Sequence, residues 1–257
     1  MDPATIIGIG MALAAIVASI VMEGGNLGSM FLVAPMVLVI FGTVGAAMAG
    51  TMFRDAKKLP RALVRAFAAR QVRPDENVEV IVALADRARR EGLLSLDRDM
   101  DQIADPFLRR AVEMAVDGTD ADEIAEILGA EVDAKRAADA SEAKLFHDMG
   151  GYSPTIGIIG TVLGLIHVLG SLTDPSSLGE KIAGAFVATL WGVLAANVLW
   201  FPLSNRLKRV SEIACEQMEL TIEGVLAIQA GSSPRLIARK LASMVPVDDS
   251  PTAREVA

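Results

Sequence analysis

The sequence predicts an all-α integral membrane protein with four transmembrane helices, a helical cytoplasmic insert between spans two and three, and a helical C-terminal cytoplasmic extension. Three observations lead to this fold class. The chain is 52% hydrophobic with positive mean hydropathy, yet 22% of its 257 residues are charged. Its apolar residues lie in long blocks, whereas a soluble domain would scatter them at periods of 2 or about 3.6. Lys and Arg concentrate between and after these blocks.

Each of the four apolar blocks is long enough to cross a membrane, because a bilayer core takes roughly 20 helical residues. None of the blocks contains Asp, Glu, Lys or Arg. No Lys or Arg precedes the first block, unlike in a secretory signal, so we expect a retained membrane helix. The predicted spans are residues 4–22, 30–52, 154–172 and 182–203.

The connections between the spans predict the orientation. Glu23–Ser29 joins the first two spans, and a short stretch with the turn signal Asp174-Pro175 joins the last two. The two short loops carry only Lys181, whereas the insert and the segment after Leu203 carry nearly all other Lys and Arg residues. Since such residues near span ends stay in the cytoplasm, we expect the insert and both termini there.

The first part of the insert has two helical patterns. Residues 77–90 carry apolar side chains at helical spacing, and Gly92 follows them. Pro106 can open the next helix, because the first helical position needs no N–H. Asp117-Gly118 is expected to close it.

A long third helix is expected in the rest of the insert. Asp120 followed by Glu123 resembles a capping box, which satisfies free N–H groups at a helix start. The helix should run toward Met149, and Gly150-Gly151 should break it before the third span.

After the fourth span, an amphipathic helix is expected to continue the span. Gly231 should end it, Ser233-Pro234 should start a short last helix, and the tail from Pro246 is expected to be disordered. Its apolar residues at helical spacing are Leu207, Val210, Ile213, Ala214, Met218, Ile222 and Val225. The predicted regions are thus residues 1–53 (spans one and two), 54–151 (insert), 152–205 (spans three and four), 206–245 (C-terminal helices) and 246–257 (tail).

Spans three and four each carry one face of small residues. Small residues let helix backbones approach closely in lipid, so these faces could pack the bundle itself or a partner helix. The face of span three is Gly157, Gly160, Thr161, Gly164 and Val168, and that of span four is Ala185, Ala188, Thr189, Gly192 and Ala196.

Thr161 and Thr189 lie near the middle of these faces. A buried hydroxyl can bond its own helix, or it can offer oxygen to a dehydrated cation, and the sequence leaves both open. An ion path normally needs an ionisable group in the membrane, and the only titratable candidate is His167, toward the outer end of span three. If the chain handles ions, a partner must supply the carboxylate.

Several classes of function are disfavoured. The net charge of −8 argues against nucleic-acid binding. No phosphate-binding Gly-x-x-x-x-Gly-Lys loop occurs, and one Cys (Cys215), two His and one Tyr offer neither a metal cluster nor a nucleophile–base set. We therefore expect no enzyme and no cofactor.

Four stretches carry a resemblance to a known family. They are Pro154 to Leu165 (PTIGIIGTVLGL), Ala188 to Gly192 (ATLWG), Val116 to Asp122 (VDGTDAD), and Glu223 to Gly231 (EGVLAIQAG) followed by Ser233-Pro234-Arg235. Together they are specific, and the pattern covers nearly the whole chain. It resembles the MotA/PomA stator proteins of the bacterial flagellar motor.

The resemblance implies a pentameric ring of such chains in the bacterial inner membrane, around a pair of single-span MotB- or PomB-type subunits. Each B helix would bring an ion-binding aspartate, and ion passage would turn the ring against the rotor protein FliG. Arg89, Arg90 and Asp97 match the rotor-contacting charges, with Asp97 in place of the usual Glu. A solvated helix face is the alternative role for these three charges.

The resemblance also assigns roles within the spans. Pro154 and Pro202 match prolines at the cytoplasmic ends of spans three and four, where they would act as hinges. Thr161 matches a position that is Thr in sodium-driven relatives and often Ala in proton-driven ones, so sodium is favoured. His167 resembles some proton-driven relatives instead.

Three other functions stay open. An ExbB/TolQ-type energiser shares the last two spans but has one span before the cytoplasmic domain, whereas two are predicted here. A plain membrane scaffold would have no reason for two small-residue faces with central hydroxyls. A self-contained transporter is disfavoured by the few spans and by the lack of a broken, polar midplane helix.

Overall fold

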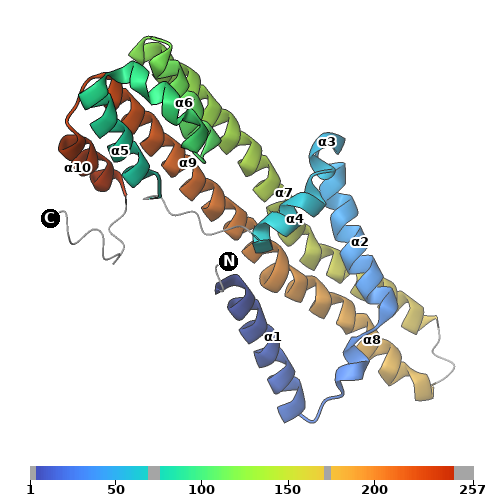
Figure 1. Ribbon diagram of the computed structural model, residues 1–257. Helices are drawn as coiled ribbons and strands as arrows, with labels where there is room; N and C mark the ends of the chain where they lie inside the picture. The colour runs from blue at the N-terminus through green and yellow to red at the C-terminus, as the bar shows by residue number, and fades with distance from the viewer. Residues whose placement is uncertain (1–3, 69–75, 171–174, 246–257) are drawn as a thin grey trace. The chain divides into compact units, whose positions relative to one another are not determined.

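The computed structural model of the chain describes residues 4–68, 76–170 and 175–245, and Figure 1 shows its helices. Within these ranges there is no β-strand. Four helical stretches are long and apolar enough to cross a membrane, so the predicted all-α membrane fold is confirmed. They are Thr5–Met22, Leu27–Ala49, Ala121–Leu169 and Lys181–Gln229.

The chain forms two compact units. The first combines Met1–Arg70 with Asp139–Arg209, and the second combines Gln71–Ala138 with Val210–Ala257. The regions expected from the sequence, divided after residues 53, 151 and 205, are membrane and cytoplasmic regions and stay a prediction. The first unit also includes residues outside the predicted spans, because Ala62 and Ala66 pack with Phe146, Met149 and the end of span four in one apolar cluster.

The N-terminal part of the first unit holds the first two spans and two short helices that the sequence does not predict. The first span begins and ends where it is expected, and the second, Leu27–Ala49, begins and ends three residues before the expected range 30–52. The Asn26 side chain accepts a hydrogen bond from the Gly28 N–H at 2.8 Å, which starts a 3₁₀ turn before the second span. The elements are α1 (Ala4–Met22), η1 (Leu27–Met30), α2 (Val33–Ala49), α3 (Phe53–Ala56) and α4 (Leu59–Ala68).

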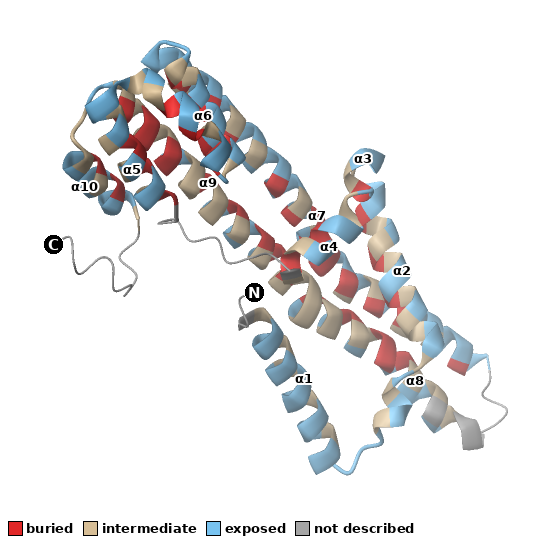
Figure 2. Ribbon diagram, viewed as in Figure 1, coloured by how far each residue is buried: buried red, intermediate tan, exposed pale blue. Residues whose placement is uncertain are grey.

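Helix α1 is exposed along its length, as Figure 2 shows. None of the residues Thr5–Met22 is buried within the chain. An apolar helix with no buried side in its own chain needs lipid or other protein chains around it.

Two long helical stretches complete the first unit and extend into the second. One is α7, Ala121–Leu169. The other runs without interruption through α8 (Pro175–Leu194), a π-helical turn η3 (Ala195–Trp200) and α9 (Phe201–Gln229). The expectation that the fourth span continues into an amphipathic helix is met by this stretch.

The prediction that Gly150-Gly151 breaks the long helix is wrong, because α7 passes through both glycines and through Pro154. Glycine costs only about 1 kcal/mol in a helix interior, which packing can offset. At Gly150 that packing is the ring of Phe201, since a Cβ atom there would lie 2.6 Å from the ring. The glycine makes room for an aromatic side chain and does not end the helix.

The second unit is a small helical domain with a core of large apolar side chains. Its elements besides parts of α7 and α9 are α5 (Glu76–Glu91), η2 (Leu93–Gln102, a 3₁₀ helix), α6 (Pro106–Val116) and α10 (Pro234–Met244). Ile81, Leu96, Leu108, Leu128 and Leu241 are fully buried in this core.

The helix boundaries predicted for this unit agree with the structure. Gly92, Gly118 and Gly231 all have positive φ, a conformation that glycine adopts without strain, and each follows a helix end. Asp120 accepts a hydrogen bond from the Asp122 N–H at 3.0 Å, which caps the start of α7. The turn expected at Asp174 and the tail expected from residue 246 lie outside the described residues.

Candidate functional site

The small-residue faces of spans three and four lie against each other within the chain. A Cβ atom at Gly157 would come within 2.8 Å of the Ala188 carbonyl oxygen, and one at Gly192 within 3.0 Å of the Gly157 Cα atom. Further along, a Cβ atom at Gly164 would lie 2.6 Å from the Cβ atom of Ala185. Helices α7 and α8 are therefore in backbone contact, which only residues without large side chains allow.

This contact is the packing of the chain's own bundle. The six Gly and Ala residues for which the sequence also allows packing on a partner helix take part in it or lie beside it: Gly157, Gly160, Gly164, Ala185, Ala188 and Gly192. Their contact with a second protein stays a prediction. Other sides of both helices are exposed in the chain, including Ile158 and Val162 on α7 and Phe186 and Leu190 on α8.

Helix α2 packs on this helix pair. The Leu38 side chain lies 3.0 Å from the position of a Cβ atom at Gly160. Just before α2, the Trp191 Nε1–H donates a hydrogen bond of 2.7 Å to the carbonyl of Met30, the last residue of η1, and the Phe31 and Trp191 rings are 5.5 Å apart. These contacts hold the entry to α2 against α8.

Thr161 and Thr189, the two residues predicted to line an ion path, are brought together at this contact. Their hydroxyls are hydrogen-bonded to each other. The Thr161 Oγ1 atom lies 3.2 Å from the Gly157 carbonyl oxygen and 3.1 Å from that of Ala185. The Thr189 Oγ1 atom lies 3.4 Å from the same Gly157 oxygen. Two hydroxyls and two carbonyls, the oxygen cluster, thus converge between the helices.

The oxygen cluster has the chemistry of a neutral cation ligand set. Each hydroxyl has one proton and two lone pairs, so the two hydroxyls keep acceptor capacity after bonding each other. Both threonines are half-buried within the chain. No group of three or more His, Cys, Asp or Glu residues forms a metal site in the described parts of the chain. The cluster therefore offers oxygen but no negative charge.

The two prolines predicted as hinges lie inside continuous helical stretches, not at helix ends. Pro154 has no N–H, so it leaves the Gly150 carbonyl without its helical donor. Pro202 lies two residues after the end of the π-helical turn at Trp200, and such a widened turn marks an irregular part of a helix. Gly150 packs on Phe201, the neighbour of Pro202, so the two weakened backbone segments are adjacent.

Two buried hydroxyls near this region were not singled out from the sequence. Thr43 on α2 and Ser153 on α7 are fully buried, and neither hydroxyl has a hydrogen-bond partner among the described residues. A buried unpaired hydroxyl is uncommon because it loses its hydrogen bond to water. Helical periodicity alone could have placed both on inward faces, but no motif distinguishes them.

The predicted rotor-contacting charges lie in the second unit, at the end of α5 and in η2. Arg89 and Asp97 are exposed, and neither forms an ion pair with a described residue. Arg90 pairs with Asp86 one turn earlier at 2.6 Å, which partly neutralises it. The neighbouring Arg87 binds the buried Asp99 and thereby holds η2 against α5. Of the three predicted rotor-contacting charges, Arg89 and Asp97 are thus the most available to a partner, and Glu91 and Arg98 beside them are exposed as well.

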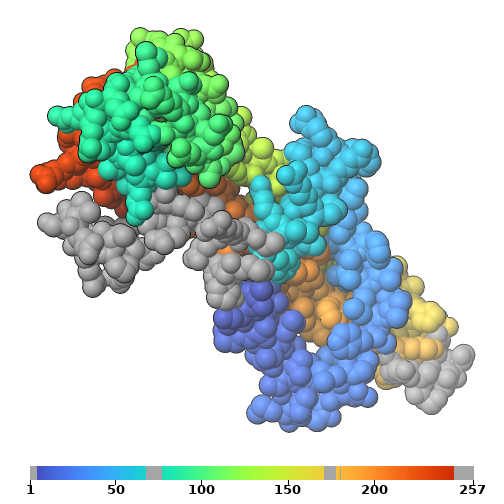
Figure 3. Space-filling model, in the orientation of Figure 1, coloured from blue at the N-terminus to red at the C-terminus, as the bar shows by residue number. Residues whose placement is uncertain are grey.

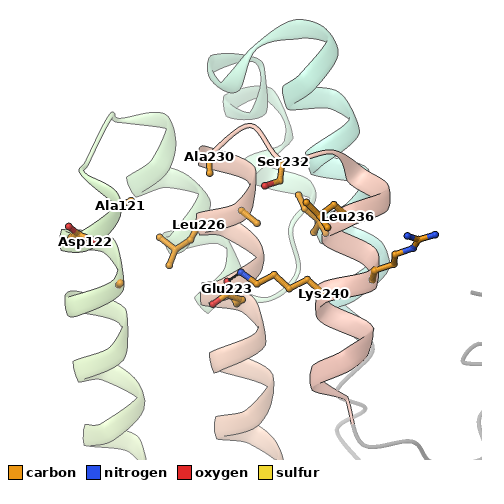
Figure 4. A pocket seen from close by; sticks show the side chains of 12 residues that line it. Ala121, Asp122, Glu223, Leu226, Ala230, Ser232, Leu236 and Lys240 are labelled. Carbon is orange, nitrogen blue, oxygen red and sulfur yellow. Dashed lines mark hydrogen bonds and ion pairs between the residues drawn. The ribbon is translucent and has the colours of Figure 1, made fainter. Parts of the chain in front are cut away.

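A groove of about 650 Å³ opens elsewhere in the second unit, between the start of α7, the end of α9 and α10. Figure 4 shows Leu226 and Leu236 beside it, and an ion pair between Glu223 and Lys240. This pair ties α10 to α9, which is a structural role. The other charges at its edge are Asp122 and Arg239, and no unpaired buried polar group points to a ligand.

The sequence matches two described families. Residues 99–220 match the MotA/TolQ/ExbB proton channel family, and residues 6–92 match the Motility protein A N-terminal family. Motility protein A of Bacillus subtilis (strain 168) is 35% identical over 250 residues, covering 97% of this chain and 93% of that protein. The chain belongs to the motility protein A family.

Solved structures agree with this membership. The flagellar MotAB stator complex from Bacillus subtilis has a chain of 34% identity with a TM-score of 0.90, matched over 96% of this chain and 98% of that one. A structure of C. jejuni MotAB gives 29% identity and a TM-score of 0.93, over 98% of both chains.

Membership of the motility protein A family confirms two expectations from the sequence. The resemblance to MotA/PomA proteins is correct, and the chain is not an enzyme. The match of residues 6–92 to the Motility protein A N-terminal family covers the two first spans, the feature that an ExbB/TolQ-type protein was expected to lack.

Proposed function

We propose that this chain is the A subunit of a flagellar motor stator, which works with a MotB/PomB-type partner to convert ion flow into rotor torque. The observation that carries the proposal is the oxygen cluster, because it places the ligand oxygens of Thr161 and Thr189 in a membrane helix pair without charge. The similar solved structures are named as MotAB complexes, which supports a partner of the B type.

Electrostatics indicates which ligands of the ion each of the two subunits would supply. A cation that has lost its hydration water is stabilised in a membrane by oxygen ligands and by a negative charge. The predicted spans of this chain contain no Asp or Glu, so the single-span partner would supply an aspartate. The chain would supply the neutral oxygens, held on a rigid helix pair. The pair is rigid because the α7–α8 backbone contact leaves no room for the two helices to move closer.

Sodium is our preferred coupling ion. Two hydroxyls and two carbonyls can replace part of the hydration shell of sodium, whereas a proton needs no such shell. A proton is the second candidate, and the description of the family matched by residues 99–220, a proton channel family, favours it.

The test is swimming speed of a deletion strain that expresses this chain with its B-type partner, in sodium and in sodium-free medium. We expect Thr161→Ala to raise the sodium concentration for half-maximal speed roughly tenfold, the equivalent of 1.4 kcal/mol. Thr161→Ser keeps the hydroxyl and should behave like the unchanged chain. Thr155→Ala is the matched control, because its hydroxyl bonds the Tyr152 carbonyl at 2.8 Å, outside the cluster.

Each outcome of this experiment decides one part of the proposal. Swimming that does not depend on sodium in the unchanged chain rejects sodium and leaves the proton. Equal behaviour of Thr161→Ala and Thr155→Ala in both media rejects the cluster as part of the ion path.

The assembly and orientation of the complex form the second part of the proposal. We place the chain in the bacterial inner membrane with both termini in the cytoplasm, as a homo-oligomer, by resemblance a pentamer. The exposed apolar sides of α1 fit contacts with lipid and neighbouring copies. Reporters near Asn26 and Arg61 should lie on opposite sides of the membrane, and the native mass of the purified complex gives the number of copies.

Torque would pass through the two long helices. Pro154 and Pro202 would serve as hinges, because each lies at a weakened part of a continuous helical stretch. Arg89 and Asp97, with Arg90 beside them, would contact the rotor protein FliG. If Pro202→Ala conducts ions normally and a strain that expresses it swims as fast as one with the unchanged chain, the hinge role is refuted.

A further inference from the structure

Helices α3 and α4 follow the second span directly and have an exposed basic side. Three residues separate Ala49, the last residue of α2, from Phe53, the first residue of α3. Residues 52–64 contain four basic side chains and one acidic side chain. The acidic one, Asp55, forms an ion pair with Lys58 at 3.2 Å and a longer one with the Arg54 guanidinium at 3.9 Å. The segment therefore has an excess of positive charge where the chain leaves the predicted membrane span.

The inner side of this segment is fixed against α7. Ala56, Ala62 and Ala66 are buried. The Arg65 guanidinium forms ion pairs with Asp139 at 2.7 Å and with Glu142 at 3.1 Å. The buried alanines and Arg65, which is paired with two carboxylates, form the inner side of the segment. The side chains on its other face therefore point outward.

The outward side combines cations with large apolar groups. Phe53 is 68% exposed and Val64 is 64% exposed, and the Arg54 side chain is 81% exposed. Arg61 is exposed one turn after Lys57, whose ammonium group lies 4.7 Å from the centre of the Phe53 ring. Figure 3 shows atoms of α3 and α4 at the surface of the first unit.

This combination fits one partner chemistry better than others. Large exposed apolar side chains are unfavourable in water, and basic side chains beside them are typical of segments that lie in a membrane interface. There the cations meet the phosphates of anionic lipids, while the apolar groups reach the boundary of the acyl chains. The segment is continuous with a membrane span, so it lies at the depth where such headgroups are found.

We infer that Arg54, Lys57 and Arg61 bind anionic phospholipid headgroups, and that Phe53 and Val64 anchor the same segment in the lipid interface. The site would hold α3 and α4 flat on the membrane beside α7. The inference relies on the membrane spans and not on the coupling ion, so its failure and the failure of the motor proposal are distinguishable.

The test measures lipid binding by the purified full-length chain. Native mass spectrometry would follow titration with phosphatidylglycerol and, separately, with phosphatidylcholine. We expect phosphatidylglycerol to bind more tightly. Each of Arg54→Gln, Lys57→Gln and Arg61→Gln should weaken its binding by roughly fivefold, the effect of one cation near an anionic membrane surface. Phosphatidylcholine binding should not change.

The matched control is the double variant Arg235→Gln, Arg239→Gln, which removes two exposed cations from α10. It should bind phosphatidylglycerol like the unchanged chain. Equal binding of the two lipids by the unchanged chain, or equal losses in the control and in the α3–α4 variants, would overturn the inference.

A second measurement tests the apolar anchor without relying on charge. A fluorophore on Val64→Cys, in lipid nanodiscs, should be quenched by brominated lipid, whereas one on Leu236→Cys should not. The native Cys215 is buried and would not be labelled. If the Val64→Cys label is not quenched and the variant forms disulfide-linked copies instead, this surface is a contact between copies and the lipid site is refuted.

Discussion

In the first unit the closest contacts join helix backbones, whereas in the second unit they join large apolar side chains. Between α7 and α8, Gly157 and Gly192 lie so close that neither can carry a side chain. In the second unit, Ile81, Leu108 and Leu241 fill a core that excludes water. The difference follows from the solvent. Lipid solvates apolar side chains as well as other apolar side chains do, so membrane helices gain from close backbone packing. The hydrophobic effect stabilises the core of the second unit, and in the first unit it also acts on the apolar cluster around Phe146 and Met149, two residues outside the predicted spans.

The largest effect should come from removing a side chain in the second unit. Leu108→Ala leaves a cavity in a core where Leu108 is fully buried, so we expect a loss of about 2–5 kcal/mol in the free energy of unfolding of that unit. Hydrogen exchange of the purified chain would show faster exchange at amides of α5 and α6. Unchanged exchange there, or an equal change in α2 and α8, would contradict the contrast between the units.

Adding a side chain should be the damaging change in the first unit. The methyl group of Gly157→Ala would lie 2.8 Å from the Ala188 carbonyl oxygen, and we expect a cost of roughly 1–3 kcal/mol from overpacking. Gly151→Ala, on the same helix, meets nothing within 4 Å and should be neutral or stabilise the helix by up to about 1 kcal/mol.

Thermal unfolding of the two variants in the same detergent measures this difference. A Gly157→Ala protein that is as stable as Gly151→Ala would show that α7 and α8 can separate freely, and the close-contact interpretation would be wrong.

The smallest effect on stability is expected at the exposed charges of α5. Arg89→Glu should change the free energy of unfolding by no more than about 0.5 kcal/mol, because the side chain is exposed and unpaired among the described residues. Swimming should nevertheless slow several-fold if Arg89 contacts the rotor. Arg235→Glu, an equally exposed charge reversal on α10, is the control, and an equal slowing by both variants would refute a specific contact.

The fold could be predicted where the sequence has a strong local signal. The four charge-free blocks predict the spans, and Gly92, Gly118 and Gly231 predict helix ends because their backbones adopt positive φ. The signal failed at Gly150-Gly151, where Gly150 contacts Phe201, 51 residues later in the chain, and the helix stays continuous. Helix α4 was also missed, although its apolar residues recur at helical spacing: Leu59, Ala62, Leu63, Ala66 and Phe67.

The sequence predicted which residues form the candidate site, but it did not predict which helices they contact. Helical spacing places Thr161 and Thr189 on small faces, and the structure brings their hydroxyls together. Spacing on one helix cannot show which other helix a face meets. The sequence therefore left open whether the two faces pack the chain's own bundle or a partner helix. The structure shows that Gly157, Gly164 and Gly192 meet the chain's own helices, and the partner contact stays a prediction.

The hydrogen bond from Trp191 to Met30 has an optical consequence. The chain has two tryptophans, Trp191 and Trp200, and both belong to the first unit. Intrinsic fluorescence of the protein therefore reports only on that unit, and the Trp191 emission should shift to longer wavelength when α2 leaves α8 and water reaches the indole. Neither tryptophan lies in the second unit, so its unfolding must be followed with an introduced fluorescent dye.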